Sequence, residues 1–280
     1  MSQPNLLIVG VGFDADAHLN DGTRQAIEGA EDVFLVLGDS SLIARVRRLK
    51  QGAEILPFQR GPLVNYSVAS WHSVIVNWCD RVLSPLLRGR SVCVVFQGHP
   101  AIGLSPAHVL GSRARAAGFS VRMLPAVSAA DVLYACLGFD PLSSGCQHFD
   151  AMDFLVRPRD VSASTPLILW QVGIIGAPAQ GRQCIDQRRF TVLCSVLSQK
   201  YGPNHEVILF EITTDLSRPT ALRVPLRNLV KHRVTECSTL FVPPLATPDI
   251  DATMLDRLKL SAEQLPYASD FLLPVCYLTS

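Results

Sequence analysis

The sequence predicts an α/β fold arranged as two α/β domains, and three observations point to it. At 280 residues the chain is long for one domain and comfortable for two. Strand-like and helix-like segments alternate, and the strand-like segments are apolar throughout, which is typical of a parallel sheet covered by helices on both faces. The turn at Leu124-Pro125 separates two such series. We therefore expect an N-terminal α/β domain over residues 1–124, a C-terminal α/β domain over 125–245, and a helix and tail over 246–280.

The first half of the chain alternates regularly between strand and helix. Short, unbroken apolar runs mark the strands, the first of them at residues 5–10. Helical spacing of apolar residues marks the helices, and the first helix, at 23–30, begins at a capping threonine. The remaining elements follow in chain order: a strand at 32–37, a helix at 40–49, a strand at 54–58, a helix at 66–87 that bends or ends near Pro85, a strand at 92–96, a helix at 105–117 and a strand at 120–124.

The second half repeats this pattern less regularly. Turn formers and polar residues are frequent at 140–164, so we expect a crossing segment with shorter antiparallel strands there. Apolar runs and helical spacing predict the other elements in chain order: a strand at 167–172, a helix at about 186–201, a strand at 207–210, a strand at 239–242 and a helix at 251–263.

Charge and composition exclude several classes of function. The formal net charge is +1, with acidic and basic residues scattered, so no electrostatic footprint for nucleic acid is present. A solvated helix face explains the basic run at 45–50. None of the eight cysteines forms a CxxC pair or lies at zinc-ligand spacing with a histidine, so no metal site is expected. Without a signal segment or a membrane-length apolar run, the sequence indicates a reduced, cytoplasmic globular protein.

A turn at residues 97–100 raises the question of function. The run Val92–Phe96 is apolar throughout, and it ends in Gln-Gly-His-Pro. Ligands of open parallel sheets bind beyond the carboxyl ends of the strands, and a glycine lets a ligand approach the backbone. The turn is therefore a candidate ligand site. An ordinary strand-to-helix turn, in which His99 only caps or packs, explains the same residues.

Two better-known patterns fit less well. Residues 7–15 match the loose dinucleotide fingerprint of a strand followed by G-x-G-x-x-A, and Asp39 follows the next strand. That mechanism requires a helix to begin at once, so that its N-terminus meets the pyrophosphate. Here the helix is expected only at Thr23, after several carboxylates that would repel phosphate. A Ser-His-Asp hydrolase would need a G-x-S-x-G elbow, which the sequence lacks.

Several stretches, taken in order, resemble one family. They are LLIVGVGF at 6–13, IEGAEDVF at 27–34, FQGHPAIGLSPAH at 96–108, GFSVRMLPAVSAADVLYACLGFDPLSSGC at 118–146, LILWQVGIIGA at 167–177 and STLFVPP at 238–244. Together they resemble the tetrapyrrole-methylase-like (class III) methyltransferases that depend on S-adenosyl-L-methionine (SAM). Within that class they are most similar to the borosin peptide backbone N-methyltransferases. The family's usual Gly-Asp-Pro turn is Gly-His-Pro in the borosin branch, as at 98–100 here.

The resemblance implies a tetrapyrrole-methylase-like fold, with two α/β domains, the SAM cleft between them, and a homodimer. The cofactor contacts would come from the turn at 97–100, from the interdomain turn and from the second domain. Carried over residue by residue, the cofactor-binding set is Gln97, His99, Ile102, Ser128, Ala129, Gln171, Ile212, Thr213, Ser238 and Thr239. Helix capping or turn formation also explains Ser128 and Ser238, and one geometry can satisfy both roles.

The resemblance also implies a reaction centre. Borosin enzymes resemble one another in an arginine four residues before a tyrosine, with further tyrosines lining the pocket. Tyr66 matches that tyrosine, but Pro62 stands at the arginine position, so Arg60 is the candidate for the arginine role in a rearranged loop. Phe58 and Gln97 stand where the family carries tyrosines. We expect Tyr66 and Arg60 to be catalytic, although packing at the start of a helix also explains Tyr66.

Three interpretations of the function follow. In the first, the chain methylates backbone amides of a separate ribosomal precursor peptide, delivered in trans, because the sequence ends soon after the last matching strand. In the second, it methylates a side chain or a small heterocyclic molecule, which loses a proton more easily. In the third, it binds SAM or a peptide without turnover, as a partner subunit. We expect the first, with no nucleic-acid or membrane partner.

Overall fold

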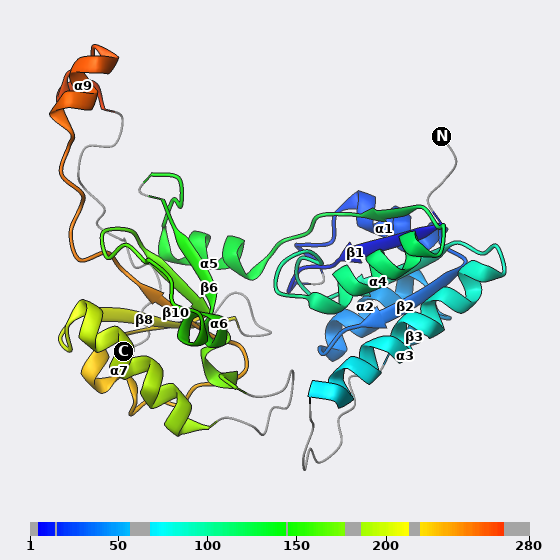
Figure 1. Ribbon diagram of the computed structural model, residues 1–280. Helices are drawn as coiled ribbons and strands as arrows, with labels where there is room; N and C mark the ends of the chain where they lie inside the picture. Colours follow the sequence, from blue (N-terminus) through cyan, green and yellow to red (C-terminus); the bar gives the residue numbers. More distant parts are fainter. Residues whose placement is uncertain are drawn as a thin grey trace. The chain divides into compact units, whose positions relative to one another are not determined.

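The computed structural model describes residues 5–14, 16–56, 68–143, 145–176, 186–212 and 219–265. Its contacts divide the chain into two compact units, the first reaching Val132 and the second beginning at Leu133 (Figure 1). Each unit contains a five-stranded sheet with helices packed against it. The predicted α/β class is therefore confirmed.

The sheet of the first unit is entirely parallel, as the apolar strands predict. Its strands lie in the order β3-β2-β4-β1-β5, with β4 in the middle and β5 at one edge. Because all strands run the same way, their carboxyl ends meet at one edge of the sheet. The strands are β1 (Leu6–Gly10), β2 (Asp32–Val36), β3 (Glu54–Ile55), β4 (Val92–Phe96) and β5 (Val121–Met123).

Helices cover both faces of this sheet. Successive strand residues point to opposite faces. Ile8 and Val94 therefore pack with side chains of α3 and α4, whereas Val9 and Val95 pack with side chains of α1 and α2. The helices are α1 (Asp21–Gly29), α2 (Ser40–Leu49), α3 (Val68–Leu87) and α4 (Ser105–Ala116).

Helix α1 begins two residues before the predicted start. Its N-cap is Asn20, whose Oδ1 accepts a hydrogen bond from the Thr23 N–H at 2.8 Å. Thr23, the predicted cap, is buried inside the first turn, and its hydroxyl donates to the Gly10 carbonyl at 3.5 Å. Asparagine and threonine both cap helices well, so composition alone did not separate them.

The sheet of the second unit is mixed, in the order β6-β7-β10-β8-β9. Strands β6 and β7 are parallel, β10 is antiparallel to both of its neighbours, and β8 and β9 are antiparallel. The strands are β6 (Gln147–Asp150), β7 (Leu167–Trp170), β8 (Glu206–Glu211), β9 (Thr220–Pro225) and β10 (Ser238–Val242).

One expectation for this unit is wrong, and one of its strands was not predicted. The segment 140–164 contains one strand, β6, parallel to its neighbour, followed by α6 (Ala151–Val156), and no antiparallel strands among its described residues. The antiparallel pairing comes instead from β8, β10 and the unpredicted strand β9. β9 begins with Thr220, and Arg223 interrupts its apolar run, so it lacks the signal of a fully buried strand.

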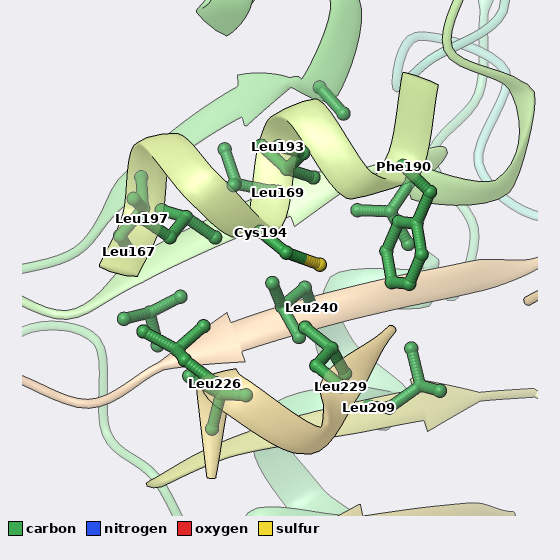
Figure 2. Close-up of a cluster of buried hydrophobic side chains, with 14 of the residues drawn as sticks. Leu167, Leu169, Phe190, Leu193, Cys194, Leu197, Leu209, Leu226, Leu229 and Leu240 are labelled. Carbon is green, nitrogen blue, oxygen red and sulfur yellow. The ribbon is translucent and has the colours of Figure 1, made fainter. Parts of the chain in front are cut away.

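Helices α7 (Gln187–Tyr201) and α8 (Leu226–Leu229) contribute to the core of the second unit (Figure 2). Leu193, Cys194 and Leu197 of α7 pack in one cluster with the strand residues Leu169 and Leu240. Burial raises the pKa of the Cys194 thiol to about 12, so it stays protonated and packs as a small apolar side chain.

The remaining helices are short. They are α5 (Ala129–Leu137), which spans the division between the units, η1 (Val172–Ile174), α9 (Ala252–Leu258) and η2 (Ala262–Gln264). The predicted helix at 251–263 is thus divided, because Lys259 takes a left-handed conformation with φ 55° and ends α9. Among the residues described, every helix is too short or too polar to cross a bilayer.

Candidate functional site

The candidate site of the first unit lies beyond the carboxyl ends of β1, β4 and β5. Gly10 pairs with Phe96 at the end of the β1–β4 ladder. Past that point the two turns stay joined, because the Gly98 N–H donates to the Gly12 carbonyl at 2.9 Å. A Cβ atom on Gly10 would lie 2.2 Å from the Gly98 carbonyl oxygen, so only glycine permits this close backbone contact. Backbone packing therefore fixes the shape of this edge.

The turn after β4 carries three predicted cofactor residues. Gln97 Oε1 accepts a hydrogen bond from the Gly38 N–H at 3.4 Å, which ties the turn to the end of β2. His99 Nδ1 accepts one from the Ala101 N–H at 3.1 Å, so this nitrogen is unprotonated and Nε2 holds the proton of the neutral ring. Ile102 is 50% exposed, which is uncommon for an isoleucine. The turn thus presents polar groups and one open apolar side chain together.

Ser128 is buried and forms the N-cap of α5, which begins at Ala129. Its N–H and its hydroxyl donate to Asp131 Oδ2 at 2.6 and 2.7 Å, and its Oγ accepts from the Asp131 N–H at 3.2 Å. This reciprocal pattern is a capping box. Ser128 therefore caps the helix. The N–H groups of the first helical turn, which have no partner within the helix, follow it directly in the chain.

The loop after β1 is held by two side chains that the sequence did not single out. His18 Nδ1 accepts hydrogen bonds from the N–H groups of Phe13 at 3.2 Å and Asp14 at 3.4 Å. Asp14 Oδ1 accepts from the N–H groups of Ala17 and Asp16, both at 2.8 Å, and these two bonds lower the pKa of Asp14. Asp14 in this acidic stretch therefore stabilises a turn through hydrogen bonds from its side chain to the backbone.

The candidate residues of the second unit gather at one edge of its sheet. Strands β7 and β8 run in the same direction, antiparallel to β10 between them. Their carboxyl ends consequently lie beside the start of β10. Gln171 follows β7, Ile212 follows β8, and Ser238 and Thr239 open β10. The structure thus brings these four predicted cofactor residues to a single edge.

Gln171 and Gly173 shape the turn after β7. Gln171 has φ 61° and is one of two non-glycine residues with a positive φ among those described. Such conformations cost energy and occur preferentially at functional sites. A Cβ atom on Gly173 would lie 2.0 Å from the Thr235 carbonyl oxygen, so this turn is pressed against the loop that precedes β10.

Glu211 organises the start of β10, although the sequence did not indicate it. Its Oε1 accepts hydrogen bonds from the hydroxyl of Ser238 and from that of Thr235, the latter at 2.9 Å. Ser238 is fully buried, and its Oγ accepts from the Thr235 N–H at 2.7 Å. Within the described part of the chain no donor reaches Glu211 Oε2.

An aromatic array precedes the Gln171 turn. The Trp170 indole N–H donates to His148 Nδ1 at 3.2 Å, and the two rings stack. Tyr134 Oη lies 2.8 Å from His148 Nε2. Because an indole N–H only donates, His148 Nδ1 is unprotonated, and the neutral ring donates from Nε2 to Tyr134. His148 keeps part of its surface exposed, yet burial of its ring lowers the pKa of this histidine, which also favours the neutral form.

The predicted catalytic residues Tyr66 and Arg60 lie outside the described residues, as does Thr213 of the predicted cofactor set. Helix α3, which follows Tyr66 in the chain, is described from Val68. The roles of these three residues stay predictions.

Comparison with known proteins defines the class to which this fold and site belong. Residues 5–172 match the Tetrapyrrole (Corrin/Porphyrin) Methylases, and the chain belongs to this family. The matched region includes the whole parallel sheet, the turns at its carboxyl edge, and strands β6 and β7.

Curated relatives confirm the resemblance to the borosin branch. The chain is 30% identical over 266 residues to a methyltransferase/type I borosin cyclic peptide precursor from Serendipita vermifera subsp. bescii, covering 93% of this chain and 64% of the relative. It is 31% identical over 272 residues to the methyltransferase/dendrothelin A precursor from Dendrothele bispora (strain CBS 962.96), covering 94% and 63%. The chain therefore spans slightly less than two thirds of the length of these relatives.

Solved structures confirm the fold. The methyltransferase CobJ superposes with a TM-score of 0.59 at 16% identity, covering 89% of this chain and 98% of CobJ. Uroporphyrin-III C-methyltransferase from Thermus thermophilus, complexed with S-adenosyl homocysteine, superposes with a TM-score of 0.56 at 13% identity, covering 86% and 98%.

Proposed function

We propose that the chain is a SAM-dependent methyltransferase that N-methylates backbone amides of a ribosomal precursor peptide. The observation that carries the proposal is the gathering of the described cofactor candidates at one sheet edge in each unit. Membership of the tetrapyrrole methylase family supports the reaction and the cofactor. The relatives' descriptions, which join a methyltransferase to a ribosomally synthesized peptide precursor, support the substrate class.

The described residues fit a sulfonium nucleoside. Ribose hydroxyls need an acceptor, and Glu211 Oε2 offers one. The adenine edge needs polar partners, and the exposed amide of Gln171 offers both a donor and an acceptor. Ile102 provides an exposed apolar surface beside His99 and Gln97. We assign these groups to holding the cofactor.

The chain's part in the reaction is alignment and proton handling. SAM supplies the methyl group on a positively charged sulfur. The protein must hold the acceptor nitrogen in line with that group and exclude water. A backbone amide is a very weak acid, so a base or a stabiliser of the negative amide is also required. We assign removal of the amide proton to Tyr66 and stabilisation of the negative amide oxygen to Arg60.

One observation favours a second candidate function. Gln97 stands where the borosin enzymes carry a tyrosine, and its amide oxygen accepts a hydrogen bond from the Gly38 N–H. The turn therefore contributes no phenolic hydroxyl. A side chain or a small heterocyclic molecule loses its proton more readily than an amide and needs less assistance. Methylation of such an acceptor is the alternative to peptide N-methylation.

We also propose that the protein acts as a homodimer in the cytoplasm. The resemblance to the borosin enzymes supports the dimer. Free thiols support a reducing compartment, and five of the described cysteines are free: Cys79, Cys93, Cys136, Cys146 and Cys194. Light scattering during size-exclusion chromatography measures the oligomeric state, and a mass equal to one chain at all concentrations would contradict the dimer.

Calorimetry of the full chain tests the cofactor. We expect saturable binding of SAM and S-adenosylhomocysteine and no binding of NAD. Binding of NAD without either methionine-derived ligand would overturn the proposal.

Incubation with isotope-labelled SAM and candidate peptides tests the reaction. We expect mass increases in steps of one methyl group, located on backbone nitrogens by fragmentation. Methyl groups found on side chains would establish the second candidate. Cofactor binding with no transfer to any peptide or small acceptor would establish a non-catalytic partner subunit.

A further inference from the structure

A hollow of about 390 Å³ opens on the first unit between the loop after β1 and the segment that leaves β5. Pro125, Ala126 and Val127 form one wall, and His18 and Asn20 line the other. None of these residues belongs to the predicted catalytic or cofactor-binding set. The hollow therefore adjoins the candidate site of the first unit, and its lining residues carry no predicted role.

The wall at 125–127 has unpaired backbone groups. Strand β5 is at the edge of its sheet, and the Leu124 N–H still donates to the Ile8 carbonyl at 2.9 Å. Beyond that bond, the N–H and C=O groups of Ala126 and Val127 make no hydrogen bond within the described chain. Unpaired backbone that continues an edge strand is a site where another chain adds by main-chain hydrogen bonding.

The opposite wall offers side-chain groups that suit a peptide bond. Asn20 Oδ1 caps α1, and its Nδ2 donates to the Pro125 carbonyl at 3.5 Å, which draws the two walls together. His18 Nδ1 is occupied by the N–H groups of Phe13 and Asp14, so in the neutral ring Nε2 is a donor. A peptide unit presents one donor and one acceptor. The hollow therefore matches a peptide backbone better than a purely apolar ligand.

Carboxylates around the hollow determine which charge a bound peptide can carry. Asp131 lines it, and Asp14, Asp16 and Asp21 lie on the adjoining loop and the first turn of α1. Two of the four are neutralised by arginines, since Asp16 and Asp21 form ion pairs. The remaining carboxylates disfavour an acidic ligand.

We propose that this hollow docks the acceptor peptide as an extended, uncharged or basic segment that hydrogen-bonds through its backbone to Ala126 and Val127. The assignment of the occupant as methyl acceptor rests on the proposed function. Val127 directly precedes Ser128, which is one of the predicted cofactor residues. Binding through backbone hydrogen bonds tolerates varied side chains in the peptide. It also weakens once the peptide is methylated, because an N-methyl amide has no N–H to donate.

Titration of the isotope-labelled full chain with a defined peptide tests the site. The probe is acetyl-Val-Gly-Val-Lys-Val-Gly-amide, followed by amide chemical shifts. We expect saturable shifts at Ala126, Val127 and His18. Two further versions of the probe carry N-methyl groups on alternate residues, one on the odd-numbered and one on the even-numbered positions. One version should bind about tenfold more weakly than the unmethylated probe, and the other should bind nearly as tightly. Replacing its lysine by glutamate should weaken binding. Equal affinity for all versions, or shifts that avoid residues 125–127, would overturn the proposal.

A matched pair of variants isolates the backbone group. Val127→Pro removes one N–H, whereas Val127→Ala keeps it and trims the side chain. We expect about tenfold weaker peptide binding for Val127→Pro and little change for Val127→Ala, with SAM affinity preserved in both. Equal loss in both variants would show that side-chain packing holds the peptide and would overturn the backbone assignment. If Val127→Pro does not fold, binding of the N-methylated probes to the unmodified chain tests the same backbone hydrogen bonds.

The two proposals fail in different ways. If the unmodified chain binds the peptide at 125–127 but binds no SAM, the docking site stands and the proposed function fails. If it binds SAM and methylates peptides without shifts at Ala126 and Val127, the function stands and the docking site fails.

Discussion

Gln171 is held in a conformation that glycine would adopt at lower cost. A left-handed backbone costs a non-glycine residue about 1 kcal/mol. The preceding Trp170 is anchored to His148 by a hydrogen bond and by stacking. The following Gly173 is pressed against Thr235. The surrounding contacts therefore impose the strained turn, and they hold the Gln171 amide where we propose that it binds the cofactor.

Replacing Gln171 by glycine should separate stability from function. Gln171→Gly relieves the strain, so we expect an unfolding free energy that is unchanged or higher by up to about 1 kcal/mol. Because the amide is lost, we expect SAM affinity to fall by about tenfold. Denaturant unfolding and calorimetry measure the two quantities. Lys259→Gly is the matched control, since Lys259 is the other described non-glycine residue with a positive φ. It should leave SAM affinity unchanged, and an equal loss there would contradict the assignment of Gln171.

His148 should make stability depend on pH. The fold lowers the pKa of His148 below its ordinary value of 6.5 through burial, and the Trp170 donor requires a neutral Nδ1. As pH falls below 6.5 the unfolded chain takes up the proton first, so the free energy of unfolding decreases through that window. We expect the melting temperature to drop from about pH 7 to about pH 5. His148→Asn retains an acceptor for Trp170 and does not titrate, so the decrease should be smaller in this variant. An identical pH profile in both proteins would show that other groups control it.

At the scale of elements, periodicity in the sequence predicts most of the fold. The strands of the first unit are short apolar runs, and α2 and α7 agree with their predicted spans to within one residue at either end. Strand β9 escaped prediction because its polar residues break the apolar run, and the parallel pairing of β6 depends on its neighbour β7 rather than on its own composition. Patterns within an element are local, whereas the direction of pairing is set by contacts with distant segments.

Capping explains a carboxylate that first suggested a ribose site. Asp39 Oδ1 accepts hydrogen bonds from the N–H groups of Ser41 at 2.7 Å and Leu42 at 3.1 Å, at the start of α2. We expect Asp39→Ala to lower the unfolding free energy by about 1 kcal/mol, and Asp39→Ser, which keeps an acceptor, to cost only a few tenths, about 0.3 kcal/mol. Thermal or denaturant unfolding of the two variants measures the difference. SAM affinity should be unchanged in both. Equal destabilisation by both would mean that the cap is not the stabilising group.

At the scale of the whole molecule, the candidate site was only partly predictable. Resemblance predicts cofactor roles for Gln171, Ser238 and the turn after β4, because each belongs to a short motif. Glu211 was missed, since it meets Ser238 only through the β8–β10 register, across 27 residues of sequence. His18 was missed because its role depends on how the loop after β1 folds back on itself. A sequence motif identifies residues that lie close together in the chain. Strand register and the folding of loops determine which side chains from distant parts of the sequence lie beside them in the site.

Cofactor binding and removal of the amide proton are assigned to different residues of the chain. If Tyr66 removes the amide proton and Arg60 stabilises the resulting charge, both act only on the reacting amide. Tyr66→Phe and Arg60→Ala should then lower the rate of methyl transfer at least about a hundredfold, the usual contribution of a positioned acid or base. SAM affinity should stay within about threefold of the unmodified chain, because the described cofactor candidates lie on other segments. Single-turnover transfer to a peptide and calorimetry with SAM measure the two effects. A parallel loss of affinity would place these residues in the cofactor site, and undiminished transfer in both variants would assign the proton-handling role to other groups.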